Sequence, residues 1–294
     1  MNKTQKEKIL KAGKISKEVK DWIKPQIKEG TSLLEIAEKI ESKIAELGAK
    51  PAFPTNLSIN EIAAHYTPSY NDETKAHGIL KVDLGVHVNG WIADTSFSVD
   101  LENSEENKKL IEASKKALQN AIKAVEEKNS LGEIGKAVQE TIESFGFSPI
   151  INLTGHEMNE YELHSGLTIL NIENSKKESL DKGLYAIEPF ATNGAGKIYE
   201  GKPSGIYILI NGKNVRSPEA RKILEFIGDN YKTLPFCSRW IVKKFGPIAL
   251  FSLKQLEANG NIHQYPQLVE ASHGKVSQSE DTILIDEKVI VTSE

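Results

Sequence analysis

Two segments of the chain repeat one pattern of residues at a constant offset of 98 positions. Each begins at a serine, continues with apolar residues at helical spacing, and ends at a glycine with a proline three residues later. All amphipathic helices share apolar spacing, but seven identities in register favour a duplicated unit. The identical pairs are Ser32 and Ser130, Leu33 and Leu131, Glu35 and Glu133, Ile36 and Ile134, Ile44 and Ile142, Gly48 and Gly146, and Pro51 and Pro149. The chain is therefore expected to contain two related halves of roughly a hundred residues each.

The repeated segments also carry signals for the first turn of a helix. Ser32 with Glu35, and Ser130 with Glu133, match the capping box, in which two side chains accept hydrogen bonds from backbone N–H groups at the start of a helix. A further helix is predicted over residues 5–24, where apolar side chains recur at helical spacing.

A β-hairpin is the clearest element of the first half. Two runs of alternating polarity, Ile79–Val88 and Trp91–Asp100, are joined by Asn89-Gly90, the dipeptide that favours a two-residue hairpin turn. This turn places Val88 opposite Trp91. The resulting apolar face carries Val82, Leu84, Val86, Val88, Trp91, Ala93, Thr95 and Phe97. The hairpin should pack that face against the rest of its half.

The other face of the hairpin carries two carboxylates. It consists of Asp83, Gly85, His87, Ile92, Asp94 and Ser96. Asp94 lies opposite Gly85, so Asp83 is its diagonal neighbour, with Cβ atoms roughly 7–8 Å apart or somewhat less. Solvated aspartates are common on an antiparallel sheet, but aspartate is disfavoured inside strands, and Gly85 would clear space for a close ligand. The pair is a candidate metal site.

The second half predicts strands and then a helical insertion. Residues 167–172 and 184–190 have strand-like sequence. Residues from about 201 to 272 carry helix signals, among them the N-cap and first-turn sequence Ser217-Pro218-Glu219. Residues 281–291 return to strand alternation. We therefore predict an α+β fold with an inserted helical subdomain at approximately 201–272.

Composition excludes several classes of protein. The 294 residues carry 37 basic and 41 acidic side chains, a net charge of −4 that gives no general attraction to nucleic acid or membranes. The N-terminus lacks an apolar signal segment, and no apolar run is long enough to span a bilayer. The single cysteine, Cys237, excludes an internal disulfide and is expected to be packed rather than nucleophilic. A cytoplasmic location is expected.

His156, Glu188 and Glu280 are further candidate ligands, although each by itself is more readily structural. His156 follows a Thr-Gly pair, Glu188 lies inside an apolar strand, and Glu280 directly precedes one. The pair His156-Glu157 is not a zincin helix, because Glu160 stands where the second histidine would be. Carboxylate-rich sites with one imidazole suit divalent metals that retain a water molecule as nucleophile.

Six short motifs resemble those of the methionine aminopeptidases. They are Ala63-Ala64-His65-Tyr66-Thr67-Pro68, Lys81-Val82-Asp83-Leu84-Gly85, Asp94-Thr95-Ser96, Leu153-Thr154-Gly155-His156, Ile187-Glu188-Pro189-Phe190 and Gln278-Ser279-Glu280-Asp281-Thr282. The long insertion before Glu280 is similar to the type II branch, and the short N-terminus to its archaeal members. The resemblance extends over the whole chain. It implies one catalytic domain over residues 1–294 with the pita-bread fold, a pseudo-twofold α+β duplication with a winged-helix-like insertion.

The resemblance implies two divalent ions of cobalt, manganese, iron or zinc. The implied ligands are Asp83, Asp94, His156, Glu188 and Glu280, with Asp94 and Glu280 bridging the ions. On a duplicated origin, Asp83 and Asp94 would correspond to Glu188 and Glu280, with the insertion separating the second pair. Glu188 would also shuttle a proton for the water nucleophile.

The resemblance also implies substrate contacts. His65 and His164 would donate hydrogen bonds to the charge that develops in the reaction. Phe53, His65 and Tyr265 would line a pocket for a methionine side chain, although Phe53 and Tyr265 could equally be core aromatics. His87 has no implied ligand role. The implied activity is removal of the initiator methionine from new polypeptides with a small second residue.

Two other functions are left open by the sequence. One is that of an Xaa-Pro aminopeptidase or prolidase-like relative. The other is that of a non-catalytic pita-bread binding protein, although such proteins lose ligands and this chain has all five. Basic residues of the insertion are more simply a mixed solvated face than a DNA contact. The expected partners are nascent polypeptides that begin with methionine, with no membrane or specific nucleic acid; a monomer is expected, and ribosome association is left open.

Overall fold

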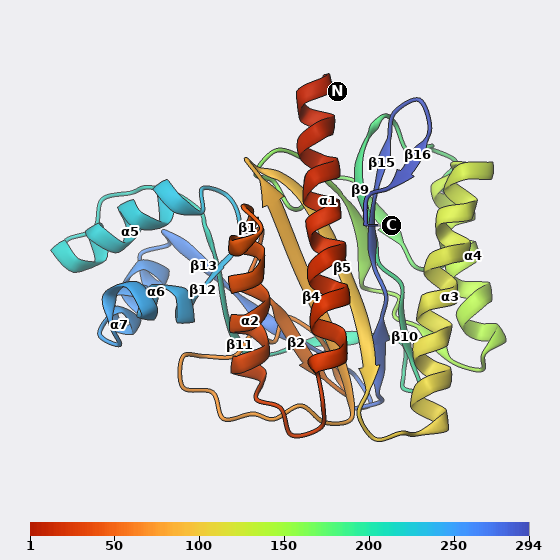
Figure 1. Ribbon diagram of the computed structural model, residues 1–294, viewed down its shortest axis with the longest axis horizontal. Coiled ribbons are helices and arrows are strands. Elements are labelled where there is room, and N and C mark those ends of the chain that lie inside the picture. Colours follow the sequence, from red (N-terminus) through yellow and green to blue (C-terminus); the bar gives the residue numbers. More distant parts are fainter. Residues whose placement is uncertain (294) are drawn as a thin grey trace.

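Two halves with similar elements lie beside each other, and a third group of helices projects to one side (Figure 1). The computed structural model describes residues 1–293. The first half comprises α1 (Lys3–Ile23), η1 (Lys24–Gln26), α2 (Leu33–Glu46), β1 (Lys50–Pro51), β2 (Asn56–Ile59), β3 (Ile62–Ala64), β4 (Ile79–Val88) and β5 (Trp91–Asp100). The second comprises α3 (Glu105–Glu127), α4 (Leu131–Ser144), β6 (Ser148–Pro149), β7 (Thr154–Met158), β8 (Thr168–Leu170), β9 (Gly183–Ile187), β10 (Phe190–Thr192), β14 (Val276–Gln278), β15 (Asp281–Ile285) and β16 (Val289–Val291).

The repeat at an offset of 98 is confirmed in the backbone. Helices α2 and α4 begin and end at positions that differ by 98, as do β1 and β6. Gly48 and Gly146 end the two helices with φ of +76° and +81°, which favours glycine at both positions. The chain then turns back identically, because the N–H of Ala49 donates to the Ile44 carbonyl and the N–H of Phe147 to the Ile142 carbonyl.

The predicted capping boxes are wrong, although both serines are N-caps. Neither Ser32 nor Ser130 accepts a side-chain cap bond, and Glu35 and Glu133 pair with lysines instead. Backbone carbonyls from distant segments accept hydrogen bonds from the N–H groups at the helix starts. These bonds join Leu33 N–H to Thr74 O (3.0 Å), Leu131 N–H to Glu178 O (3.0 Å) and Gly132 N–H to Lys176 O (2.9 Å). A tertiary contact has replaced the local one.

The hairpin has the predicted bounds and register. Val88 pairs with Trp91 and Gly85 with Asp94, while Asn89 and Gly90 both have positive φ, as the two-residue turn requires. Its apolar face packs under α1 and α2, whose buried side chains form one core with it. Helices α3 and α4 cover a second core in the other half. The opposite face of the hairpin is thereby turned toward the junction of the halves.

Strand pairing extends the duplication beyond the helices. In the first half Pro51 pairs with Val86, and in the second Pro149 pairs with Ala191. The partners of the two prolines are offset by 105, so β4 corresponds to β9 and β10. Counting along these strands with the same offset, Asp83 corresponds to Glu188.

The expected equivalence of Asp94 with Glu280 is wrong by two residues. Gly85 pairs with Asp94 in the first half, and Phe190, at its offset of 105, pairs with Gln278 in the second. Asp94 therefore corresponds to Gln278, and Glu280 corresponds to Ser96. Ser96 and Glu280 exchange backbone hydrogen bonds of 3.2 and 3.3 Å, which joins the halves at these two equivalent positions. The sequence spacing could not reveal this, because the insertion lies between the second pair.

The inserted segment contains strands as well as helices. It comprises β11 (Ile198–Leu209), α5 (Pro218–Asn230), β12 (Phe236–Cys237), α6 (Ser238–Phe245), α7 (Ala249–Ala258) and β13 (Ile262–Glu270). The helices lie within residues 218–258, whereas the outer parts of the expected helical range, 201–209 and 262–270, are strands that pair with each other. Ser217 caps α5 as predicted. The subdomain boundary stays a prediction.

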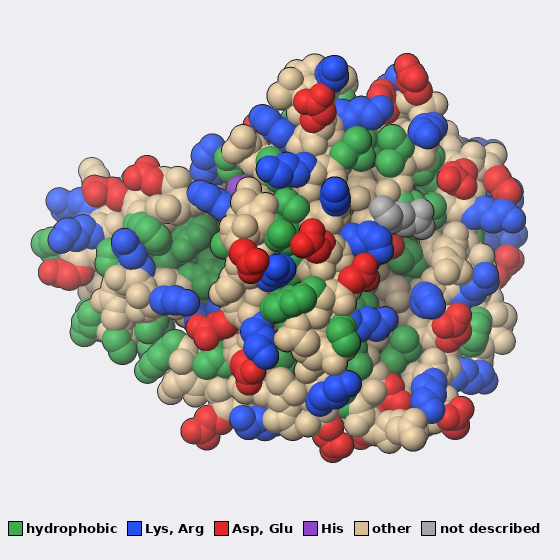
Figure 2. All heavy atoms as spheres, viewed as in Figure 1, with side chains coloured by type: hydrophobic (Ala, Val, Ile, Leu, Met, Phe, Trp, Pro, Cys, Tyr) green, Lys and Arg blue, Asp and Glu red, His purple; other side chains and the backbone are tan. Residues whose placement is uncertain are grey.

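The surface of the insertion is mixed in character. Figure 2 shows lysine, arginine and acidic side chains interspersed over this part, beside apolar side chains. Ile248 and Phe251, at the start of α7, are the most exposed large apolar residues, 74% and 63%. No helix within residues 1–293 combines the length and apolar character that a membrane crossing needs.

A buried ion pair fastens the insertion to the first half. Arg239 of α6 donates two hydrogen bonds to the Glu41 carboxylate of α2, at 2.7 and 2.8 Å, and a third to the Pro68 carbonyl. The Trp240 indole also donates to Glu41 (2.8 Å). The N–H of Thr55 adds a longer bond to the same carboxylate. Glu41 thus holds α6 and the segment before β2 together.

Replacing Glu41 with glutamine should destabilise the protein by about 3–5 kcal/mol, because it leaves the Arg239 guanidinium buried without its counter-charge. Urea denaturation measures the change. Glu46→Gln removes an exposed partner of Lys43 on the same helix and should cost less than about 1 kcal/mol. Equal effects of the two substitutions would contradict the structural role of the Glu41–Arg239 pair.

Candidate metal centre

A cavity of about 230 Å³ lies where the two halves and the insertion meet. The structure brings all nine of the sequence-derived site residues to its wall. They are Phe53, His65, Asp83, Asp94, His156, His164, Glu188, Tyr265 and Glu280. Residues separated by up to 227 positions, from Phe53 to Glu280, therefore share one cavity.

All five expected ligands lie on or directly beside paired strands. Asp83 and Asp94 come from β4 and β5, and Glu188 and Glu280 flank the paired ends of β9 and β15. His156 lies on β7, next to β9. Paired strands fix side-chain direction with a period of two, and Glu188 and Glu280 directly adjoin such strands, so strand pairing sets most of the geometry of the site.

The ligand atoms lie within the reach of a shared cation. His156 Nε2 is 3.7 Å from Asp94 Oδ2 and 3.6 Å from Glu188 Oε1. One possible ligand atom each from Asp94, His156 and Glu280 lies within 4.8 Å of the others. Asp94, His156 and Glu280 are buried, with 4%, 6% and 2% of their surfaces exposed.

The four carboxylates destabilise one another's ionised forms. Burial raises the pKa of Asp83 to about 7. Burial, followed by the charges of neighbouring carboxylates, raises the pKa of Asp94, Glu188 and Glu280 well above the usual range. Among residues 1–293, no lysine or arginine forms a direct ion pair with any of the four. A bound cation would supply the positive charge that stabilises their ionised forms.

Unpartnered polar atoms fit the same conclusion. Within the described chain, Asp83 Oδ1 and Asp94 Oδ1 are buried without a hydrogen-bond partner. Such atoms are costly in a protein interior unless a ligand satisfies them. Carboxylate oxygens with one imidazole nitrogen are the donor set that divalent first-row metals accept. The residues present therefore fit metal ions.

The three histidines of the cavity are held neutral. Burial, with a smaller contribution from His164, lowers the pKa of His156 to about 3, and burial lowers the pKa of His65 to about 4 and that of His164 below its ordinary value. A neutral imidazole is the form that ligates a metal. The His156 and His164 rings lie edge to face, 4.3 Å apart.

His65 has a tautomer fixed by the backbone. Its Nδ1 lies 3.1 Å from the Pro266 carbonyl, so in the neutral ring Nδ1–H donates and Nε2 is left as an acceptor. His65 also has a positive φ of 63°, uncommon for a non-glycine residue. The expected donor role therefore suits His164 better than His65.

Phe53 fills the space that Gly85 leaves. A Cβ at Gly85 would lie 2.3 Å from the Phe53 ring. The expectation that Gly85 clears room for a ligand between the carboxylates is corrected: the glycine admits an aromatic wall. Tyr265 lies on the other side of the site, 5.6 Å from the His65 ring. The two aromatic residues thus form walls of the cavity.

Sequence reasoning missed several residues that line the cavity. They include Asn56, Leu153, Thr154, Leu163, Ile206, Pro235 and Gln278. Asn56 pairs with Asp83 across β2 and β4, and its Oδ1 has no partner within the described residues. Gln278 lies two residues before Glu280, so the alternation of an extended segment could have placed it on the ligand face. Asn56 had no comparable signal.

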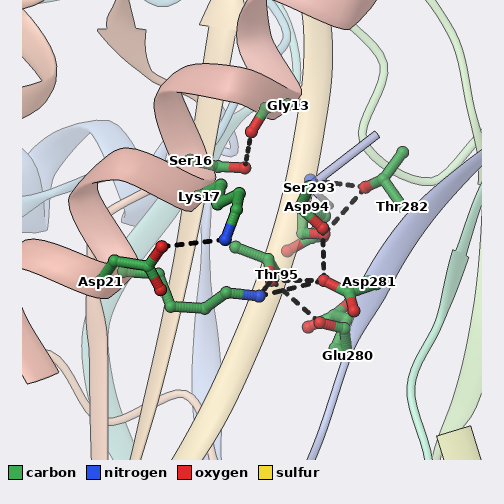
Figure 3. Close-up of polar contacts among 11 residues, drawn as sticks. Gly13, Ser16, Lys17, Asp21, Asp94, Thr95, Glu280, Asp281, Thr282 and Ser293 are labelled. Carbon is green, nitrogen blue, oxygen red and sulfur yellow. Dashed lines mark hydrogen bonds and ion pairs between the residues drawn. The ribbon is translucent and has the colours of Figure 1, made fainter. Parts of the chain in front are cut away.

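A hydrogen-bond network supports Asp94 and Glu280 from behind (Figure 3). Thr95 donates to the Glu280 carbonyl (2.9 Å) and to the Asp281 carboxylate (3.0 Å). The N–H of Asp94 donates to the Thr282 hydroxyl, which donates to the Asp94 carbonyl. Lys20 of α1 bonds to Thr95 and Asp281. The backbones that carry the two expected bridging ligands are thereby tied together.

Comparison with known proteins places the chain in a family. Residues 7–287 match the model of metallopeptidase family M24. The methionine aminopeptidase of Methanocaldococcus jannaschii is 48% identical, covering 96% of this chain and 95% of its own length. Among solved structures, a thermophilic Arx1 has a TM-score of 0.86 at 16% identity, covering 99% of this chain and 91% of its own. The methionine aminopeptidase of Thermotoga maritima has a TM-score of 0.72 at 22% identity, covering 100% and 98%.

The metal-free protein should lose stability as pH rises. The pKa of Asp83 is raised from about 3.9 in an unfolded chain to about 7 in the fold. The contribution of Asp83 to the free energy of unfolding is fully present below about pH 4 and is lost as pH rises through about 7. The Asp83→Asn variant cannot ionise at this position. As pH rises from 5 to 8, its free energy of unfolding should therefore increase relative to that of wild type by on the order of 2–4 kcal/mol. Urea denaturation in chelator measures this difference.

At pH 8, added divalent metal should make wild type the more stable of the two proteins. Metal binds ionised carboxylates and so stabilises wild type more than Asp83→Asn. A difference between the two metal-free proteins that did not change with pH would contradict the buried, unpaired state of Asp83.

Proposed function

This chain belongs to metallopeptidase family M24, and we propose that it removes the N-terminal methionine from polypeptides with two divalent ions held by Asp83, Asp94, His156, Glu188 and Glu280. The observation that carries the proposal is the convergence of these five side chains in one cavity. The relative from Methanocaldococcus jannaschii, 48% identical and covered over 95% of its length, is a methionine aminopeptidase, which supports this activity over that of a proline-directed peptidase or a binding protein.

The proposed ligands have different roles in holding the ions. Asp94 and Glu280, tied together from behind through Thr95, Asp281 and Thr282, are the proposed bridging ligands. Asp83 would hold one ion, and His156 and Glu188, whose Nε2 and Oε1 atoms lie 3.6 Å apart, would hold the other. Ions held there would lower the pKa of a shared water and polarise the peptide carbonyl. The donor atoms suit cobalt, manganese, iron or zinc.

Glu188 is the proposed proton carrier. Burial and the charges of Asp94 and Asp83 raise the pKa of its carboxyl group. A carboxyl group with a raised pKa can accept the proton that the attacking water loses and deliver it to the departing amine. Because Glu188 is expected to remain a ligand, the same side chain orients the water and moves its proton.

The two histidines outside the ligand set face the substrate. His164, neutral and 4.3 Å from His156, is the proposed donor to the oxygen that becomes negative during attack. His65, with Nδ1–H fixed on Pro266, presents Nε2 as an acceptor for an N–H group of the substrate. Phe53 and Tyr265 are the proposed walls for the methionine side chain, whose unbranched thioether packs well against aromatic rings. The proposed substrates are nascent polypeptides with a small second residue.

The peptides Met-Ala-Ser and Leu-Pro-Ser should distinguish the activities. We expect Met-Ala-Ser to be cleaved with a kcat/KM at least about 100-fold higher, since a pocket built for one apolar side chain discriminates by about 10–200-fold and the second residue adds to this. A chelator should abolish cleavage and added Mn²⁺ should restore it. Comparable kcat/KM for the two peptides would move the assignment to a proline-directed enzyme.

His164→Ala and His156→Ala should fail in different ways. His164→Ala should keep two bound ions and lose about 100-fold or more in kcat, as expected when an oxyanion donor is removed. His156→Ala should lose metal affinity as well. Elemental analysis after dialysis, together with peptide kinetics, separates the two. One ion fewer in His164→Ala, with both retained in His156→Ala, would reverse the assigned roles.

A further inference from the structure

Gln278 faces the ligand cluster from the end of β14. It is 1% exposed and lines the cavity. Its backbone is clamped by one side chain, because its N–H donates to the Ser98 hydroxyl (2.9 Å) and that hydroxyl donates to its carbonyl (2.8 Å). Its amide is therefore held at the site by the fold and is not free to move away.

The Gln278 amide connects carboxylates from the two halves. Its Nε2 donates to Glu280 Oε2 at 3.3 Å. β14 packs against β4, the strand of Asp83, and Gln278 and Asp83 line the same cavity. The Gln278 side chain opposes the rise that burial causes in the pKa of Asp83. The Asp83 oxygen Oδ1 has no partner among residues 1–293 and remains available to a ligand.

Pseudo-symmetry makes the identity of this residue informative. Gln278 occupies the position that corresponds to Asp94, since Phe190 pairs with Gln278 as Gly85 pairs with Asp94. One half therefore supplies a carboxylate at this position and the other an amide. A carboxylate offers only acceptors, whereas an amide offers two donors. A fifth acid here would repel Asp83 and Glu280, and an amide can hold both.

Gln278 is also the right kind of donor for a site that takes cations. A lysine or arginine could bond to the same two carboxylates, but its positive charge would compete with the metal ions for them. A neutral amide orients a carboxylate while leaving its charge intact. Such supporting hydrogen bonds to ligating groups are a regular part of metal sites.

The two ions would depend on this support unequally. Ligand atoms of Asp94, His156 and Glu280 already lie within 4.8 Å of one another, in a group that does not include Asp83. Glu188 lies 3.6 Å from His156. The ion on the His156 side thus has a preformed set of ligands, whereas the ion on the other side relies on Asp83.

We infer that Gln278 is a positioning residue of the metal centre, whose amide orients Asp83 and Glu280 and so sets the affinity for the ion on the Asp83 side. The inference rests on the proposed two-ion function. It adds a residue outside the five ligands and explains why the second half supplies a neutral donor where the first supplies Asp94.

The test is metal binding by Gln278→Met, which keeps the side-chain volume and removes both donors. Calorimetric titration of the metal-free full-length protein with Mn²⁺ should show the tighter ion bound as in wild type and the weaker ion bound about 10–100-fold more weakly. Gln139→Met is the matched control, because Gln139 also donates its amide to a carboxylate, Glu143 (2.8 Å), but on the exposed face of α4. It should bind both ions as wild type does.

The outcomes separate the inference from the proposed function. Failure of wild type to bind two ions would overturn both. Two ions in wild type and unchanged affinities in Gln278→Met would overturn only the role of Gln278, because packing alone would then explain the residue. Equal weakening of both ions in Gln278→Met would overturn the assignment to the Asp83 side.

A second measurement follows Gln278 in the wild-type protein itself. The side-chain amide protons of Gln278 can be followed by NMR in wild-type protein labelled with ¹⁵N-glutamine, with the signal identified by its absence in Gln278→Met or, if that variant does not fold, in Gln278→Glu. Titration with Zn²⁺ should shift this signal mainly with the second equivalent. A signal that shifts only with the first equivalent, or with neither, would contradict the inference.

Discussion

Mutual repulsion among four carboxylates in one cavity is the constraint on which the rest of the structure depends. Burial alone makes each ionised group costly, and each neighbouring charge adds to that cost. Among residues 1–293 no lysine or arginine pairs directly with them. The carboxylates can be held together only by a frame that does not relax, and paired strands from both halves supply it. Burying these carboxylates together lowers the stability of the metal-free fold, and bound cations would offset that cost.

The frame is symmetric but its chemistry is not. Asp83 and Glu188 occupy equivalent positions and are both acids. At the other equivalent positions the halves differ: Asp94 corresponds to Gln278, and Ser96 to Glu280. His156 corresponds to Ser58, since these residues pair with Ala186 and Lys81, which differ by the same 105 positions. One half thus supplies two of the proposed ligands and the other three, which would give the two proposed ions different surroundings within one duplicated scaffold.

The insertion completes the cavity and is held to it by charge. Glu41 binds Arg239 and Trp240 of the insertion and also the backbone of Thr55, close to Phe53. The same carboxylate therefore fixes the segment that carries the aromatic wall and the helix that follows Pro235, another residue of the wall. The proposed substrate pocket and the proposed ligands are therefore positioned by different contacts: a buried ion pair fixes part of the pocket wall, and strand pairing fixes the ligands.

The sequence determined what depends on local spacing. The offset of 98, the glycines that end α2 and α4, and the register from Asn89-Gly90 could all be predicted, because helix ends and two-residue turns are fixed by neighbouring residues. The proposed ligand set rests on motif resemblance, and the structure brings its five side chains to one cavity. The secondary structure at the two ends of the insertion was predicted less well, since strands β11 and β13 are stabilised mainly by pairing with each other across about fifty intervening residues.

Only the tertiary structure decided which distant groups meet. It replaced the capping boxes at Ser32 and Ser130 with carbonyls from other segments, filled the space at Gly85 with Phe53, and made Gln278 the counterpart of Asp94. In each case the competing partner is remote in sequence and has no local signature. The sequence by itself therefore specified the elements and the chemical types of the site. Packing between the halves specified the neighbours of each group, because contact energies act through space whereas sequence patterns report only what is near along the chain.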